Sequence, residues 1–329
     1  MRSSFNDGWA RVRRAPWVVL GVWLSTVAVA LPSAVALHAM LAAHLGASLA
    51  AETAATGVNF DWWNEFLAQA GGVGQSFVPA ILGFAAVMKN LGAVADAEGV
   101  PAALAGVIVV QMAVSLFLAG GVLDRLARDR AFGAGAFFSA CGVFFFRFTR
   151  LAVIAGACYW LLFAVLHPWL FGTVYTALTR DLTVERTAFA YRVALYVVFA
   201  LPVLAVNVVF DYAKTRAVVE DRRSMIGALV AGWRFVARHP WEVAGLYALN
   251  ATLFAGVLAI YVTVAPGASA GLWAFAVGQL YIVLRVLVRL RFAASQTSLF
   301  QSRLAHAGYV ARPVPAWPDS PAAEAMRGL

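Results

Sequence analysis

Long segments without charged residues recur along the chain. Segments that lack Asp, Glu, Lys and Arg cover residues 15–51, 99–123, 151–179, 193–210 and 243–284. A helix that crosses a bilayer needs about 20 predominantly apolar residues. The last segment is long enough for two crossings, and residues 266–269 (Pro-Gly-Ala-Ser) supply a turn in its middle. The pattern predicts an all-α integral membrane protein with six transmembrane helices, near residues 17–39, 102–123, 151–174, 193–211, 243–264 and 271–290.

Two further apolar stretches, 66–88 and 131–146, fit a transmembrane helix less well. The first contains Gln69, Pro79 and several glycines, which weaken a continuous helix. The second is 16 residues long and lies between arginines. We therefore expect both stretches to form interfacial or re-entrant helices.

The basic residues distinguish the two sides of the membrane. With a cytoplasmic N-terminus, the inner segments hold 21 of the 25 Lys and Arg residues. Because loops rich in Lys and Arg face the cytoplasm, the pattern predicts that both termini are cytoplasmic. The alternative at the N-terminus is a signal peptide cleaved near residues 34–36. It is disfavoured because the apolar run exceeds the usual length of about 7–15 residues.

One polytopic membrane domain is expected over residues 1–302, with an insertion on the outer side at residues 40–100. Residues 303–329 are polar and contain four prolines. This composition is typical of a disordered segment, so we expect a largely disordered cytoplasmic tail.

The composition supports the membrane assignment. Hydrophobic residues make up 62% of the chain and charged residues 12%, against about 45–50% and about 25% in soluble domains. This excludes secreted disulfide scaffolds, nucleic-acid-binding domains and cytosolic enzymes. The net charge of +9 is explained by arginines that meet anionic phospholipid at the inner leaflet. Anionic phospholipid is therefore an expected partner, and nucleic acid is not.

An internal repeat appears when the chain is shifted by 224 residues. Residues 8–21 then align without gaps with residues 232–245, and eight of the fourteen positions are identical. In both copies a cytoplasmic helix leads to a Pro, which suits the first turn of the next helix, and then to a Trp at the level of the headgroups. Residues 137–150 occupy the same place before the third crossing. The sequence thus predicts three parallel repeats, each an interfacial amphipathic helix followed by a helix pair.

Residues 211–300 carry a loose family resemblance. The stretches 211–214 (Asp-Tyr-Ala-Lys), 217–221 (Ala-Val-Val-Glu-Asp), 232–234 (Gly-Trp-Arg) and 239–240 (His-Pro) form its pattern. They resemble polytopic bacterial membrane proteins related to the membrane domain attached to some glycerophosphodiester phosphodiesterases. The resemblance implies a fold class and an inner-membrane location. It implies no phosphodiester chemistry, because the hydrolase barrel of those enzymes is missing.

Polar residues inside predicted crossings are the main candidates for function. These are Gln111, Asn207, Asn250 and Gln279. They either line a polar intramembrane pathway or hydrogen-bond between helices and stabilise the bundle. Arg285 lies near the inner face, where we expect its side chain to reach the headgroups.

An aromatic and acidic cluster lies in the outer insertion, at residues 60–66. Its Asp61, Trp62, Trp63 and Glu65 are expected to anchor the membrane interface or to contact an outside partner. A membrane-protein partner or a homo-oligomer is compatible with this surface.

The chain has none of the common catalytic or nucleotide-binding motifs. The five histidines are scattered, and the two cysteines suggest neither a disulfide framework nor a metal site, so no cofactor is expected. The leading hypothesis is therefore a non-enzymatic accessory, scaffold or membrane-organising protein. The alternative is a permease or channel-like transporter with a polar intramembrane pathway, and the third hypothesis is a membrane enzyme acting on lipid.

Overall fold

All regular secondary structure in the described residues is helical. The computed structural model describes residues 2–46, 48–57, 59–77, 83–131, 133–265 and 271–303. Within them, six stretches are long and apolar enough to cross a membrane: Pro16–Leu45 (α2), Ala102–Arg128 (α6), Ala134–Thr179 (α7 to α8), Glu185–Val219 (α9), Pro240–Val264 (α11) and Leu272–Ser302 (α12). The predicted all-α, multi-pass architecture with six such helices is confirmed. The predicted tail, 303–329, lies outside the described residues except for Arg303.

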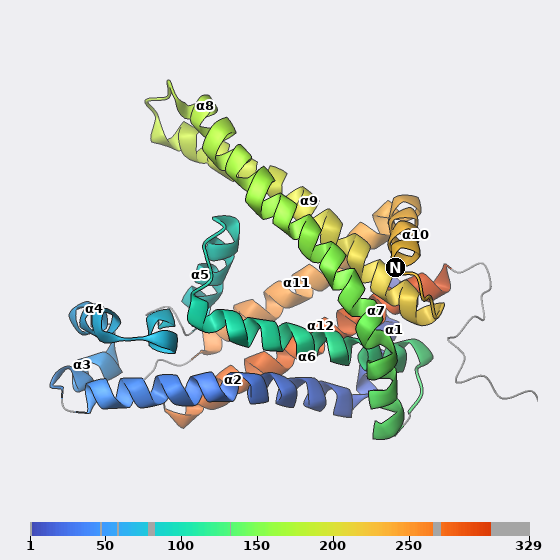
Figure 1. Ribbon diagram of the computed structural model, residues 1–329, viewed down its shortest axis with the longest axis horizontal. Helices are drawn as coiled ribbons and strands as arrows, with labels where there is room; N and C mark the ends of the chain where they lie inside the picture. Colours follow the sequence, from blue (N-terminus) through green and yellow to red (C-terminus); the bar gives the residue numbers. More distant parts are fainter. Residues whose placement is uncertain are drawn as a thin grey trace, which may run out of the picture.

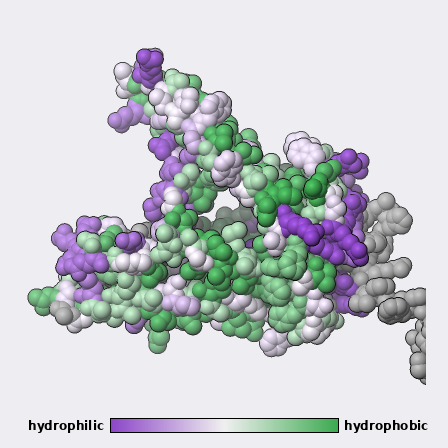
Figure 2. Space-filling view, in the orientation of Figure 1, coloured by the Kyte–Doolittle hydropathy of each residue, from purple (hydrophilic) through white to green (hydrophobic). Residues whose placement is uncertain are grey.

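The long helices present apolar side chains outward. Val109 on α6 is 64% exposed and Val153 on α7 is 69% exposed. Figure 2 shows that hydrophobic residues cover much of their surface, while hydrophilic residues gather toward the ends of the molecule. Because such a surface is unfavourable in water, it suits contact with lipid.

The crossings form two groups that diverge (Figure 1). Helices α2, α6, α11 and α12 lie together, whereas α7 to α8 and α9 form a hairpin that points away from them. The two groups meet at the end that holds the main core, where Phe148, Tyr212, Leu246 and Phe300 are almost fully buried. The end of the hairpin is thus separated from α2 and α6.

The stretch 131–146 is not a separate helix. Ala134–Leu161 (α7) runs through it and continues through π-helical turns at Leu162–Leu166 (η2) and Trp169–Val174 (η3) into Tyr175–Thr179 (α8). Pro168 lies between the two π-helical turns, and because proline cannot donate a backbone hydrogen bond it favours such a local change. At 46 residues, this stretch is about 69 Å long. It exceeds the hydrocarbon core of about 30 Å, so it is longer than one crossing needs.

Three helix pairs make the most extensive contacts. Arg2–Arg13 (α1) packs along α12, Met225–Arg238 (α10) along α9, and the first half of α7 along α6. Glycines allow the backbones to approach: a Cβ added at Gly232 on α10 would lie 3.0 Å from the Ala213 nitrogen of α9. As the sequence predicts, Pro16 and Pro240 occupy the first turns of α2 and α11.

The outer insertion consists of short helices. Ala50–Thr56 (α3), Phe60–Gln69 (α4), Gly72–Ser76 (η1) and Gly83–Ala95 (α5) follow one another. The stretch 66–88 is therefore divided by the end of α4 and by η1, and its residues 78–82 lie outside the described part. The end of α5 contacts the hairpin, where Arg192 Nη2 lies 3.0 Å from Asp96 Oδ1 and His167 Nε2 lies 2.9 Å from the Ala95 carbonyl oxygen.

Candidate functional site

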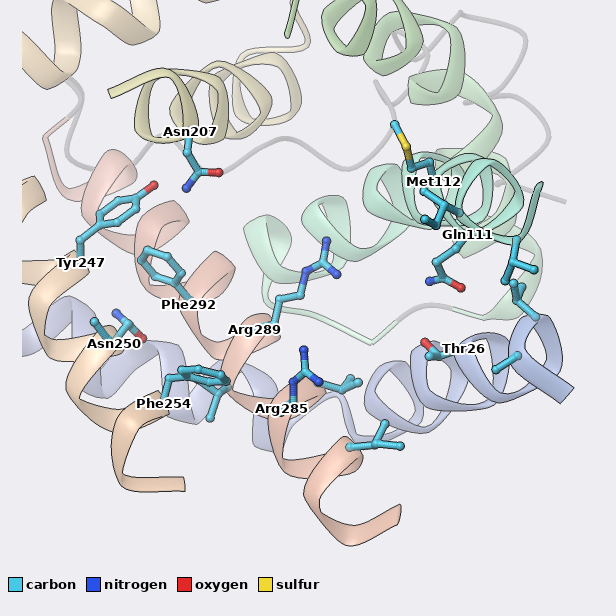
Figure 3. A pocket seen from close by; sticks show the side chains of 18 of the residues that line it. Thr26, Gln111, Met112, Asn207, Tyr247, Asn250, Phe254, Arg285, Arg289 and Phe292 are labelled. Atoms are coloured by element: carbon cyan, nitrogen blue, oxygen red, sulfur yellow. The ribbon is translucent and has the colours of Figure 1, made fainter. Parts of the chain in front are cut away.

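A large cavity lies among five of the crossings. It measures about 820 Å³ and is lined by residues of α2, α6, α9, α11 and α12. A second cavity of about 360 Å³ adjoins it. The two share six lining residues: Thr26, Gln111, Asn207, Val286, Arg289 and Phe292. Figure 3 shows the larger of the two.

The divergence of the hairpin explains the cavity. Helix α9 is buried against its neighbours from Val208 to Phe210, whereas Leu204 and Asn207, just before this segment, are exposed toward the space. Pro202 lies inside α9 one turn earlier. Because an internal proline removes a backbone hydrogen bond and bends a helix, it favours the departure of α9 from α6 and α11 at this level.

Three of the four predicted polar residues line this space. Gln111, Asn207 and Asn250 come from α6, α9 and α11, and Figure 3 shows them around one opening. Gln111 Nε2 donates to Ser115 Oγ at 3.2 Å, within its own helix. Asn207 makes no hydrogen bond with the described residues and is exposed in the cavity.

Asn250 is held more firmly than the other two amides. Its Nδ2 donates to the Leu246 carbonyl oxygen at 2.8 Å, and its Oδ1 accepts from Arg291 Nη1 at 3.1 Å. Arg291 is fully buried, and its guanidinium lies over the Phe5 ring, 3.4 Å from the ring centroid. Asn250 thus connects the cavity wall to the contact between α1 and α12.

Gln279 lies away from the cavity. Its Oε1 accepts a hydrogen bond from Trp23 Nε1 at 3.2 Å, which links α12 to α2. Of the two roles that the sequence allows for the polar residues, Gln279 therefore has the second: it hydrogen-bonds between helices and stabilises the bundle.

Two arginines of α12 also line the cavity. Arg285 and Arg289 are one helical turn apart, and Figure 3 shows both side chains pointing into the space. The Arg285 guanidinium lies over the Tyr281 ring, 5.6 Å from its centroid. Within the described part of the chain, neither arginine has an acidic partner. The sequence suggested that Arg285 reaches the headgroups, and it did not place either arginine in a site.

A hydrogen-bonded group around Asp211 lines the smaller cavity. Asp211 Oδ1 pairs with Lys214 Nζ at 2.7 Å, and Asp211 Oδ2 accepts from Tyr247 Oη at 2.8 Å and from Gln296 Nε2 at 3.2 Å. These residues join α9, α11 and α12. The nearby Thr215 is buried, and its Oγ1 has no hydrogen-bond partner among the described residues. Sequence analysis missed this group because its members meet only through the packing of three helices.

The cavity carries a positive charge. Its charged lining consists of Arg285, Arg289, Lys214 and Asp211. Since Lys214 and Asp211 neutralise each other, the two arginines leave two net positive charges. No group of three or more His, Cys, Asp or Glu residues suited to a metal occurs in the described segments.

The aromatic cluster of the outer insertion serves mainly as its core. Trp62 is 8% exposed, and its Nε1 donates to His44 Nδ1 at 2.9 Å. Trp63 Nε1 donates to the Phe77 carbonyl oxygen at 3.1 Å. Asp61 and Glu65 remain exposed on α4, so only these two of the four predicted residues are free to meet a partner.

Comparison of the chain with protein-family models, with curated proteins and with solved structures finds no match in any of the three. The function is therefore argued from the cavity itself.

Proposed function

We propose that this chain is a multi-pass inner-membrane transport protein of the permease type, with both termini in the cytoplasm. Its substrate path runs through the cavity between α9 and the group of α2, α6, α11 and α12. The observation that supports this proposal is the pair of adjoining cavities, the larger of which is lined by Gln111, Asn207 and Asn250. Ligand sites are typically concave and mainly apolar with a few convergent polar groups, and this cavity has that composition.

A scaffold would be expected to have a different interior. In a static bundle, polar side chains pair between helices and the crossings pack closely. Gln279 follows that rule through its bond with Trp23, but Asn207 and Arg289 point into open space without a partner in the described chain. This difference favours the permease hypothesis over the accessory or scaffold hypothesis.

An enzyme acting on lipid is less well supported. A general base or nucleophile needs a free atom within reach of the substrate. Among the described residues, Asp211 is the one acidic residue at the cavity, and both of its oxygens are engaged, by Lys214 on one side and by Tyr247 and Gln296 on the other. These hydrogen bonds suit a structural role, in which Asp211 links α9 to α11 and α12.

The three-repeat organisation belongs to the same proposal. Helices α1 and α10 and the first half of α7 each pack along the cytoplasmic part of another crossing, on α12, α9 and α6 respectively. Along the chain, α6 comes directly before α7 and α9 comes directly before α10, so each of these two crossings packs with the helix that follows it. Helix α12 is the last crossing and packs with α1, the first helix. The exposed arginines of α1, α7 and α10, among them Arg150 and Arg234, are placed to meet anionic phospholipid at the inner leaflet. The likeness of residues 211–300 to the phosphodiesterase-associated membrane domain is compatible with this arrangement.

Cysteine labelling tests for a hydrated substrate path. In a chain with Cys141→Ala and Cys158→Ala, we expect Asn207→Cys and Gln111→Cys to react with a charged, membrane-impermeant thiol reagent. The control is Val197→Cys, at a position of α9 that is 58% exposed but not part of the cavity lining, and it should stay unreactive in lipid. Equal and negligible labelling at all three positions would refute the path.

A further inference from the structure

The two cavity arginines lack a counter-charge. Arg285 and Arg289 project from the same face of α12 into the space (Figure 3). In the described residues, the only carboxylate lining the space is Asp211, which is paired with Lys214 at 2.7 Å. Both cavity arginine side chains are exposed in this space. By contrast, the buried Arg291 and Arg125 have protein acceptors: Arg291 donates to Asn250 and to the Phe5 carbonyl oxygen, and Arg125 donates to the Arg14 carbonyl oxygen.

An arginine at membrane depth is unfavourable unless it is paired. Arg285 lies 13 residues into α12, which is about 20 Å along the helix axis. Arg289 follows one turn later, still before the buried contact between α12 and α1. Within Leu272–Ser302 the pair therefore lies near the middle of the helix, where an anion from outside the chain would supply the missing charge.

Much of the remaining wall is apolar. Opposite and beside the arginines lie Ile108 and Met112 of α6, Leu204 of α9 and Phe254 of α11. A small hydrated anion would gain nothing from these side chains. An acyl chain would, because burying each methylene group is favourable. The surface is also hollowed between the hairpin and the other crossings, and the border of this hollow is largely apolar (Figure 2).

We propose that the cavity binds an anionic amphiphile, with an oxyanion headgroup between Arg285 and Arg289 and its acyl chain along the apolar wall. The guanidinium groups suit bidentate contact with phosphoryl or carboxylate oxygens. The side-chain amides of Asn207 and Gln111 can donate to the remaining headgroup oxygens. This inference rests on the proposed function, since it assigns the ligand class of the same cavity.

Lipid binding to the full-length purified protein tests the proposal. Native mass spectrometry in a neutral detergent measures retention of dioleoylphosphatidylglycerol against dioleoylphosphatidylcholine. We expect the wild type to prefer the anionic lipid, and Arg285→Gln with Arg289→Gln to weaken that binding about tenfold, because charge-assisted hydrogen bonds are lost. The matched control is Arg186→Gln, which removes an exposed arginine in the first turn of α9, outside the cavity.

Two further arms separate the headgroup from the chain. Ala251→Trp fills the apolar wall without a change of charge, and it should weaken retention of both lipids. It keeps the test valid should the arginine variant fail to fold. Inorganic phosphate in large molar excess should leave the bound phosphatidylglycerol in place. If phosphate displaces it readily, the ligand is a free anion and the amphiphile is refuted.

Unchanged phosphatidylglycerol binding by the folded arginine variant would also overturn the ligand assignment. Labelling of Asn207→Cys then tells the two proposals apart. If labelling persists, the permease proposal stands and only its ligand class is wrong. If labelling is absent, the hydrated path itself is refuted.

Discussion

Gly8 of α1 lies so close to α12 that a Cβ atom at this position would come within 2.2 Å of Ser295 Oγ. The Arg291 carbonyl oxygen and the Ser295 nitrogen would lie 3.0 and 3.1 Å away, and these backbone atoms cannot rotate aside. The contact joins the first helix of the chain to its last described helix. Gly8 is therefore required by close packing.

Gly8→Leu should separate α1 from α12 and destabilise the protein. Forcing extra atoms into a packed contact costs about 1–3 kcal/mol, so we expect a lower melting temperature in detergent. Gly21→Leu is the matched control, because a Cβ at Gly21 on α2 meets nothing within 4 Å. An equal loss of stability in both variants would contradict the packing argument.

Asn250 and Asn207 both line the cavity, but only Asn250 is hydrogen-bonded to other described residues. Asn250→Leu removes the acceptor of the buried Arg291. Since a lost hydrogen bond to a charged group costs about 1.5–3 kcal/mol, we expect a clear drop in the melting temperature. Asn207→Leu removes no hydrogen bond within the described chain and should leave stability nearly unchanged. Thermal unfolding of both variants in the same detergent measures the difference, and the reverse order would refute the two roles.

The contact between the end of α5 and the hairpin should depend on pH. The hydrogen bond from Tyr196, helped by Arg192, holds the pKa of Asp96 below its usual value. A carboxylate with a lowered pKa in the folded state stabilises the contact above its ordinary pKa, and this contribution is lost as the pH falls through the lowered value. Protection of the amides of residues 88–96 from hydrogen exchange, after division by the intrinsic rate at each pH, should therefore fall at acidic pH.

Asp96→Asn provides the control for this pH effect. The amide cannot ionise, so protection of residues 88–96 should be lower than in the wild type at neutral pH and should no longer change with acidification. A wild-type acid response that survives in Asp96→Asn would contradict the role of Asp96.

Hydropathy was sufficient to predict the six crossings but not their full length. Helix α9 continues from the predicted end at residue 211 to Val219, and α12 continues from residue 290 to Ser302. These extensions contain charged and polar residues, yet Ala213, Val218 and Leu299 are buried because α10 and α1 cover them. A search for uncharged stretches stops at the first charged residue. It therefore cannot detect that a helix continues beyond the crossing into a segment that is partly charged but packed against other helices.

The candidate site was predictable as a set of residues but not as an arrangement. Gln111, Asn207 and Asn250 stood out because polar residues are rare in crossings, and the structure places them around one cavity. The role of Gln279 depends on a neighbour, Trp23, that only the helix arrangement brings near. Whether the Arg289 side chain points into a cavity likewise depends on which faces of α9 and α12 diverge. The hydrophobic periodicity of the sequence does not predict those faces.

The orientation of the chain is open to a direct test. We expect Asn64→Cys, on the exposed face of α4, to react with an impermeant thiol reagent on intact cells. A cysteine near Ser224 should react only after permeabilisation, because the inner segments carry most of the basic residues.

Ser224 itself caps α10, since its Oγ accepts from the Gly227 nitrogen at 3.2 Å. The neighbouring exposed Arg223→Cys is therefore the better probe, as it spares a cap worth about 1 kcal/mol. Labelling of Arg223→Cys but not Asn64→Cys on intact cells would reverse the orientation.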